Sequence, residues 1–322
     1  MTRIQNILVG IDLHHGDRHA ATELSEESQA AVTEALQLAS TWEATLTFCS
    51  VLELSVQSQS LIEHDRENVF KTVEDFANEL LTKLVEQANA LGIACESVLR
   101  YGIAWEELAK ESTNTDYDLL LIGTRRKSRA TRFLFGSTAH NLLRFAACPV
   151  WVIKATELRE IRDVAIATDF GASSVPAFHL AVTVARAIGA RLHVLHVVEQ
   201  ADLRYLTLAG ITAESVAQTE QRLRDAAEEQ VRLQLQQTDF RTLLHGVKIE
   251  LLAGAPDSVI PEYVVAQQID LLVVGTHGQT NTIGYHSDST AERILPDLHS
   301  SLLVAKPIGF RSPYADVNSP AN

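Results

Sequence analysis

The sequence predicts an α/β fold made of two tandem, doubly wound parallel sheets of five strands each. Two observations predict it. Short apolar runs rich in β-branched residues alternate with longer segments of helical period, which is typical of βαβ units. The same succession of segments then occurs twice in a chain of 322 residues, a length that corresponds to about two domains.

The repeat has a period of about 150 residues, and four apolar runs return in the same order. Asp12 and Asp169 are 157 positions apart, whereas Ala44 and Ala190 are 146 apart, so the first half carries eleven extra residues after its first strand. Insertions of this kind belong in loops. A repeat of this length is a duplicated domain rather than a solenoid unit. The paired runs are ILVGID with VAIATD, ATLTFCSV with ARLHVLHV, YDLLLIGT with IDLLVVGT, and CPVWVIK with SSLLVAK.

The first half opens on the apolar strand 6–12, and each later strand follows a segment of helical period. Runs such as LLLIG are apolar throughout, as expected for parallel strands that helices cover on both faces. The expected order is strand 6–12, helix 26–41, strand 45–52, helix 62–91, strand 96–100, helix 104–113, strand 118–123, helix 137–146 and strand 149–154.

The second half repeats this pattern, and right-handed crossovers then favour a doubly wound sheet in each half. We place the domains at 1–156 and 157–308. The tail 309–322 follows Pro307, contains two further prolines and lacks periodicity, so we expect it to be extended or disordered. The second half is expected as strand 163–168, helix 173–188, strand 191–198, helix 212–238, strand 248–252, helix 257–267, strand 270–275, helix 289–296 and strand 301–305.

Composition excludes several classes of protein. Hydrophobic residues make up 46% of the chain, enough for globular cores. With 27 basic and 41 acidic residues the net charge is −14, which repels nucleic acid and anionic membranes, so any bound phosphate must be held by local groups. The three cysteines show neither disulfide nor zinc spacing. No signal peptide or membrane-spanning run is evident, so we expect a cytoplasmic protein.

Ligands of doubly wound sheets bind outside the carboxyl ends of the strands, where the strand order reverses. Each half also has a long loop after its fourth strand, at 124–138 and 276–290, that leads into a helix whose free backbone N–H groups suit an anion. The strand ends to inspect are Asp12, Ser50, Val51, Gly123 and Thr124 in the first half, and Asp169, His196, Val197, Gly275 and Thr276 in the second.

These features together resemble the universal stress protein family, in its tandem form and over nearly the whole chain. The family pattern is Gly-x2-Gly-x9-Gly-Ser/Thr after an apolar strand, with a strand-end aspartate and a last strand of the Cys-Pro-Val type. The resemblance implies a nucleotide-binding, adenine nucleotide alpha hydrolase-like fold. Because single-domain members pair through their last strands, it also implies an intramolecular pseudo-dimer, with the two domains related by pseudo-twofold symmetry. A homodimer of two chains is a further candidate assembly.

Each half departs from the family pattern at a different position. In the first half Arg126 replaces the second glycine, whereas Gly136 and Ser137 stand as required. The second half keeps Gly275 and Gly278, but Asp288 replaces the third glycine and its charge would repel a phosphate. We therefore favour the first half for polyphosphate. Its loop gathers five cations, which form either a phosphate or acidic-partner site or a solvated loop: Arg125, Arg126, Lys127, Arg129 and Arg132.

The resemblance implies ATP or another adenine nucleotide as the small-molecule ligand, with Mg²⁺ as its candidate companion. The strand-end aspartate would lie near base and sugar, main chain at the end of the second strand against adenine, and the glycine loop around the phosphates. The alternative is that each strand-end aspartate caps the next turn. The implied residues are Asp12, Ser50, Val51, Gly123, Arg126, Gly136, Ser137 and Thr138 in the first half, and Asp169, His196, Val197, Gly275, Gly278, Ser289 and Thr290 in the second.

We expect a non-enzymatic stress-response protein that binds a ligand and signals. The sequence lacks a Gly-x4-Gly-Lys-Ser/Thr loop, a Gly-x-Ser-x-Gly elbow and an acidic metal cluster behind the phosphate loop. The alternatives are a very slow ATPase, a binder of another small metabolite, and a structural or interaction module that binds no nucleotide. In the eleven-residue insertion, His14, His15 and His19 form either a flexible polar loop or a metal site.

Overall fold

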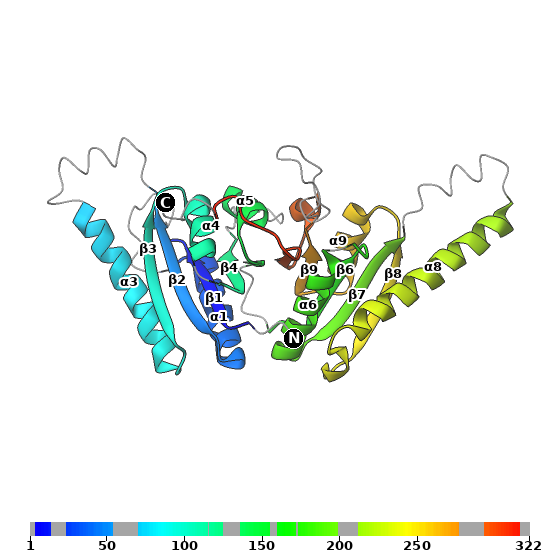
Figure 1. The fold of residues 1–322 in the computed structure, drawn as a ribbon, viewed down its shortest axis with the longest axis horizontal. Coiled ribbons are helices and arrows are strands. Elements are labelled where there is room, and N and C mark those ends of the chain that lie inside the picture. The colour runs from blue at the N-terminus through cyan, green and yellow to red at the C-terminus, as the bar shows by residue number, and fades with distance from the viewer. Residues whose placement is uncertain are drawn as a thin grey trace. The chain divides into compact units, whose positions relative to one another are not determined.

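The computed structural model describes residues 4–13, 24–53, 70–114, 116–124, 136–154, 160–171, 173–198, 212–276 and 293–315. The chain divides into two compact units. Arg3–Arg159 with Arg311–Asn322 form one, here called the first domain, and Glu160–Phe310 with Met1–Thr2 form the other, the second domain. Both are α/β units in which helices flank a sheet (Figure 1).

The first domain has a parallel sheet in the order β3-β2-β1-β4-β5. Its two halves grow in opposite directions from β1 and β4, so right-handed crossovers place α1 and α3 on one face and α4 and α5 on the other. The described elements are β1 (Asn6–Ile11), α1 (Glu26–Trp42), β2 (Thr45–Leu52), α3 (Phe70–Ala90), β3 (Cys95–Tyr101), α4 (Ala104–Asn114), β4 (Leu119–Gly123), α5 (Ser137–Phe145) and β5 (Val150–Ile153).

The second domain repeats this topology with the order β8-β7-β6-β9-β10, again with parallel pairs. Its elements are β6 (Asp163–Thr168), α6 (Ser174–Ile188), β7 (Arg191–Val198), α8 (Ala213–Gln236), the 3-10 turn η1 (Phe240–Thr242), β8 (Val247–Ala253), α9 (Pro256–Ala266), β9 (Leu271–Gly275), the 3-10 turn η2 (Leu295–Asp297) and β10 (Ser301–Ala305).

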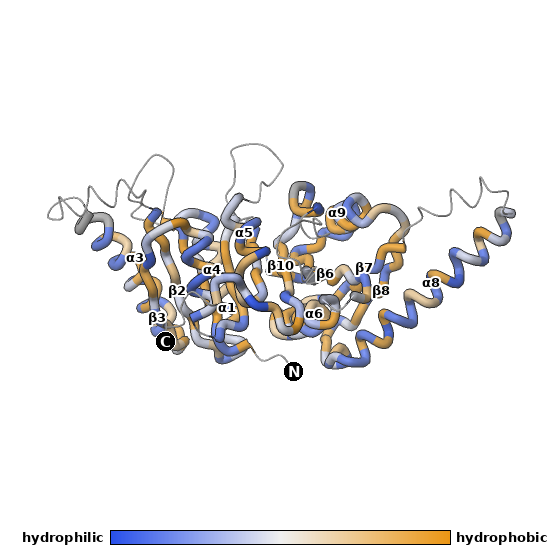
Figure 2. The backbone as a smooth tube through the Cα atoms, turned by 45° about the horizontal axis from the view of Figure 1, so that its top comes forward, coloured by the Kyte–Doolittle hydropathy of each residue, from blue (hydrophilic) through white to orange (hydrophobic). Residues whose placement is uncertain are grey.

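The predicted fold class is confirmed. Most described element bounds agree closely with the sequence expectations, although residues 62–69 of one expected helix and 289–292 of another lie outside the described residues. The expected helix 289–296 differs at its described end, where Leu295–Asp297 form the 3-10 turn η2. Strand composition explains the agreement. Residues 119–122 of β4 and 271–274 of β9 are buried on both faces, as their uniformly apolar sequence requires. Figure 2 shows that α8, by contrast, alternates between hydrophobic and hydrophilic residues.

The residues that follow the second domain do not all form an extended tail. Residues 313–315 form a turn, and the segment 311–315 belongs to the first domain rather than to the second. Ser312 is buried, and the ring of Tyr314 packs against Trp105 and Phe145. A sequence without periodicity gave no sign of this packing, because the contacts are made with residues far away in the chain. No helix among the described residues is long and apolar enough to cross a membrane.

Candidate ligand-binding site

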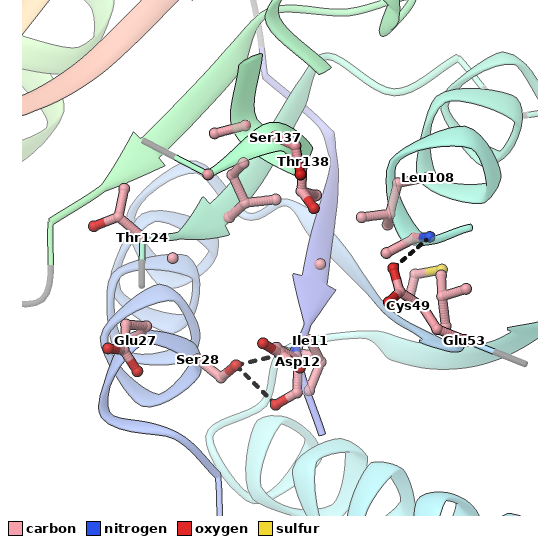
Figure 3. Close-up of a pocket in the computed structure, with 17 residues that line it drawn as sticks. Ile11, Asp12, Glu27, Ser28, Cys49, Glu53, Leu108, Thr124, Ser137 and Thr138 are labelled. Atoms are coloured by element: carbon pink, nitrogen blue, oxygen red, sulfur yellow. Dashed lines mark hydrogen bonds between the residues drawn. The ribbon is translucent and has the colours of Figure 1, made fainter. Parts of the chain in front are cut away.

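A cavity of about 230 Å³ opens at the carboxyl ends of β1, β2 and β4 in the first domain (Figure 3). β1 lies between β2 and β4, so the cavity is at the point where the strand order reverses, which is where doubly wound folds bind ligands. The lining comes from strand ends and helix N-termini: Gly10, Ile11, Asp12, Glu27, Ser28, Cys49, Val51, Glu53, Ala104, Leu108, Ile122, Gly123, Thr124, Gly136, Ser137, Thr138 and Ala139.

Asp12 is held at the cavity by its own backbone. Its N–H donates to Ser28 Oγ over 3.0 Å, and that hydroxyl donates to Asp12 O over 3.2 Å (Figure 3). Ser28 is in turn fixed in the first turn of α1, because its N–H donates to the side chain of the N-cap residue Ser25. The start of α1 and the end of β1 therefore form one bonded unit beside the cavity.

Gly123 permits a close approach of α1 to the end of β4. A Cβ atom at this position would lie 2.2 Å from the carbonyl oxygen of Glu27, far inside van der Waals contact. Gly275 plays the same part in the second domain, where a Cβ would lie 2.5 Å from Ser173 O. The resemblance placed both glycines around phosphates. The structure gives each a packing reason, and Gly123 also lines the cavity.

Gly136 is the N-cap of α5 and has room around it. Its φ of −66° suits any residue, no side chain caps the helix, and a Cβ there would meet nothing within 4 Å. The first turn of α5 contains no acidic residue, and its residues Ser137, Thr138 and Ala139 line the cavity. Free N–H groups at a helix N-terminus favour an anion, so this side of the cavity suits a phosphate or a carboxylate.

The charged side chains of the described lining are all acidic. Asp12, Glu27 and Glu53 bring three carboxylates, and no lysine, arginine or histidine stands among the described lining residues. Glu53 Oε1 accepts from the N–H of Ala104 over 3.1 Å and so caps the start of α4. Burial raises the pKa of the Cys49 thiol to about 12, which keeps it protonated and unreactive at neutral pH.

Ser50 and Val51 lie on opposite faces of β2. Cys49 and Val51 line the cavity, whereas Ser50 is absent from the lining and its buried hydroxyl has no hydrogen-bond partner. Strand alternation explains the difference. Several lining residues were missed by sequence reasoning. Ser25 stands directly before a segment of helical period and is a typical N-cap residue, so it could have located the start of α1 beside the cavity. The missed lining residues with polar side chains are Glu27, Ser28, Cys49 and Glu53, whereas Thr124 had been named as a strand end.

The second domain uses its corresponding residues differently. Asp169 Oδ1 accepts from Gly171 N over 2.9 Å and from Ser174 Oγ over 2.7 Å, so the interpretation of a strand-end aspartate as a turn cap describes this residue. His196 donates from Nδ1 to Thr168 O over 2.9 Å and stacks on Phe170, with ring centroids 4.2 Å apart. Its neighbour Val197 is half-buried at the end of β7.

Phe170 has a positive φ of 62°, which is unfavourable for a bulky residue and shows that its surroundings hold it in place. Other predicted residues lie outside the described part of the chain. These are Arg126 with the other cations of its loop, His14, His15 and His19, and in the second half Gly278, Asp288, Ser289 and Thr290. Within the described ranges, no three His, Cys, Asp or Glu side chains gather closely enough to hold a metal ion.

The fold and the cavity define a tandem α/β protein with a ligand-sized opening at a topological switch point. The sequence model of the universal stress protein family matches residues 3–154 and again 160–306. The chain belongs to the universal stress protein family and carries two tandem domains of it.

Relatives agree with this assignment. A universal stress protein of Methanocaldococcus jannaschii is 27% identical over 133 residues, which cover 41% of this chain and 78% of that protein. The crystal structure of a universal stress protein from Archaeoglobus fulgidus is similar in fold, with 19% identity, 94% of this chain and 98% of that chain covered, and a TM-score of 0.64. A universal stress protein family protein from Arabidopsis thaliana was solved with AMP bound. It is 18% identical and covers 47% of this chain and 91% of its own, and at its TM-score of 0.35 it carries no argument about this chain.

Proposed function

We propose that the first domain binds an adenine nucleotide in the cavity at the ends of β1, β2 and β4, and that the protein acts in the stress response as a binding and signalling protein. The observation that carries this proposal is the combination of a cavity at the switch point with the uncapped N-terminus of α5 on its wall. We infer a binding role rather than an enzymatic one.

The size of the cavity limits what it encloses. Its volume of about 230 Å³ lies below the ~300–1,000 Å³ of pockets that bury a drug-sized ligand. The described lining would therefore enclose only part of a nucleotide, and we propose that this part is the nucleoside. Apolar side chains such as Val51 and Leu108 would contact the base, and the phosphates would extend toward Gly136 and Ser137.

The charge of the lining sets a second requirement. The described lining carries the carboxylates of Asp12, Glu27 and Glu53, and carboxylate and phosphate oxygens are the ligands that Mg²⁺ prefers. Mg²⁺ would be bound by the phosphate oxygens of the nucleotide together with a carboxylate of this lining. We therefore propose that Mg–ATP binds more tightly than free ATP.

The proposal is tested by calorimetric titration of the purified protein with ATP, with and without Mg²⁺. Gly136→Asp places a negative charge at the start of α5 and should weaken binding at least about tenfold, while an aspartate still caps the helix. Gly136→Ala is the matched control, because its methyl group meets nothing within 4 Å and carries no charge. No heat of binding at millimolar ATP, or equal affinities for the two variants, would overturn the proposal.

A ligand that co-purifies gives an independent test. Mass spectrometry of the small molecules released on denaturation should find an adenine nucleotide. Another released metabolite would replace the nucleotide as ligand and keep the cavity as its site. Steady phosphate release that Gly136→Asp abolishes would favour the slow ATPase instead.

We infer a structural role for the second domain. Its strand-end carboxylate already accepts two hydrogen bonds, from Gly171 and Ser174, so that oxygen is committed to the turn before α6. A titration end point of one nucleotide per chain would agree with this inference, and an end point of two would contradict it.

A further inference from the structure

The segment 311–315 docks on α4 and α5, two of the helices that line the candidate cavity. Ser312 Oγ donates to the carbonyl oxygen of Phe145, the last residue of α5, over 2.7 Å. The same hydroxyl accepts from the N–H of Tyr314 over 3.2 Å. Ser312 is only 4% exposed, and both bonds are partly buried. A residue 167 positions away in the sequence thus satisfies a carbonyl at the end of α5.

An aromatic cluster holds the same segment against α4. The ring of Tyr314 lies edge-on to Trp105 and to Phe145, with centroids 6.2 and 6.3 Å away, and these two rings are 5.5 Å apart. These distances fall in the favourable range for aromatic pairs. Burial raises the pKa of the Tyr314 hydroxyl above its ordinary value, and the charge of Glu106 acts in the same direction. The ring is therefore neutral across the physiological range.

Both helices that carry this cluster also line the cavity. The N-terminal turn of α5, opposite to Phe145, lines it, and so does Ala104, the residue of α4 next to Trp105. α5 is nine residues long, about 13 Å, so its fixed C-terminus and its cavity-lining N-terminus belong to one short rod. The chain just after α5 is also bonded to α4, because Ser112 Oγ of α4 accepts from the N–H of Ala147 over 2.9 Å.

We propose that Ser312 and Tyr314 are positioning residues for the ligand cavity, and that the segment 311–315 is a strap that sets α4 and α5 in their ligand-competent positions. The segment follows the second domain in the chain and belongs to the first domain. Coupling between two sites is reciprocal: a docked strap favours ligand, and bound ligand favours the docked strap. The ligand half of this inference rests on the proposed function.

Full-length variants test it. Ser312→Ala combined with Tyr314→Ala removes the bond and the ring, whereas Tyr314→Phe keeps the ring in the cluster. Phe76→Ala is the matched control, because it removes an exposed ring from α3 of the same domain, away from the cavity lining. Two readouts are compared: hydrogen exchange of the α5 amides without ligand, and affinity for Mg–ATP.

The double variant should speed exchange of the α5 amides about five- to tenfold and weaken Mg–ATP by a similar factor, within the usual range of coupling between sites. Tyr314→Phe and Phe76→Ala should leave both readouts unchanged. Unchanged exchange in the double variant would overturn the strap, whatever the affinity. If the wild-type protein binds no ATP, the proposed function fails, and the exchange comparison still decides whether the strap positions α5. Faster exchange with wild-type affinity would refute the coupling to the cavity.

Discussion

Gly123→Ala is the sharpest test of how the first domain is built. The added Cβ would lie 2.2 Å from Glu27 O and 2.5 Å from Glu27 C, and both obstacles are backbone atoms that no rotamer change can move. To restore ordinary contact at 3.4 Å, the start of α1 must retreat by about 1.2 Å. That movement would strain the hydrogen bonds between Ser28 and Asp12, so the cavity wall would change together with the packing.

The expected cost is at the upper end for overpacking, about 3 kcal/mol of unfolding free energy, or a fall in Tm of roughly 6–12 °C for a domain of this size. All three tryptophans, Trp42, Trp105 and Trp151, stand in the first domain, so their fluorescence during urea unfolding reports on that domain alone.

Gly136→Ala is the control, because its Cβ would meet nothing within 4 Å and its loss of stability should stay below about 1 kcal/mol. If Gly123→Ala unfolds at the same urea concentration as wild type, the close approach of α1 to β4 is not required and the reasoning fails.

Three further variants are expected to have measurable effects on stability. Burial raises the pKa of Glu34 from 4.5 to about 7, so ionisation of its carboxyl destabilises the folded state increasingly as the pH rises from about 4.5 to 7. Glu34→Gln should therefore raise the free energy of unfolding by up to about 3 kcal/mol at pH 8 and leave it unchanged at pH 4. Glu111 is 4% exposed and pairs with the half-exposed Arg100, so Glu111→Ala should lower the free energy of unfolding by about 2–3 kcal/mol. Glu79→Ala removes one partner of an exposed surface pair and should lower it by less than about 0.5 kcal/mol. Urea unfolding followed by tryptophan fluorescence measures the stability of the Glu34 and Glu111 variants. Equal losses of stability for Glu111→Ala and Glu79→Ala would contradict the prediction for Glu111. Tyr263→Phe removes the partner of His193 Nδ1 at 2.9 Å and should cost about 1–2 kcal/mol by circular dichroism, and an unchanged unfolding curve would refute this.

Several residues that the sequence singled out at strand ends and at the start of α5 line the cavity, namely Asp12, Val51, Gly123, Gly136 and Ser137. Ser50 was named for its main chain, and its side chain lies on the face of β2 opposite to Cys49 and Val51, because strand side chains alternate. The pairing of Ser28 with Asp12 was missed. The eleven-residue insertion separates them in sequence, and only the packing of α1 on β1 brings them together.

A comparison of the two halves shows that residues at corresponding positions of the repeat can make different contacts. Asp12 and Asp169 occupy corresponding positions in the repeat, but the turn that follows each one differs. In the second domain a short turn brings Gly171 and Ser174 to the carboxylate, whereas in the first domain the backbone of Asp12 bonds to Ser28. A repeat thus predicts corresponding positions, and the local turn decides which atoms each residue uses.

The sequence by itself determined the element order, the duplication and the doubly wound topology, because hydrophobic period and crossover handedness act locally along the chain. Only the tertiary structure decided which side chains surround the cavity, why Gly123 must lack a Cβ, and where the segment after Phe310 packs. These properties depend on contacts between residues that are far apart in sequence. Ser312 and Phe145 show it most directly, since nothing in either local sequence points to the other and their hydrogen bond exists only because the folded chain brings them within 2.7 Å.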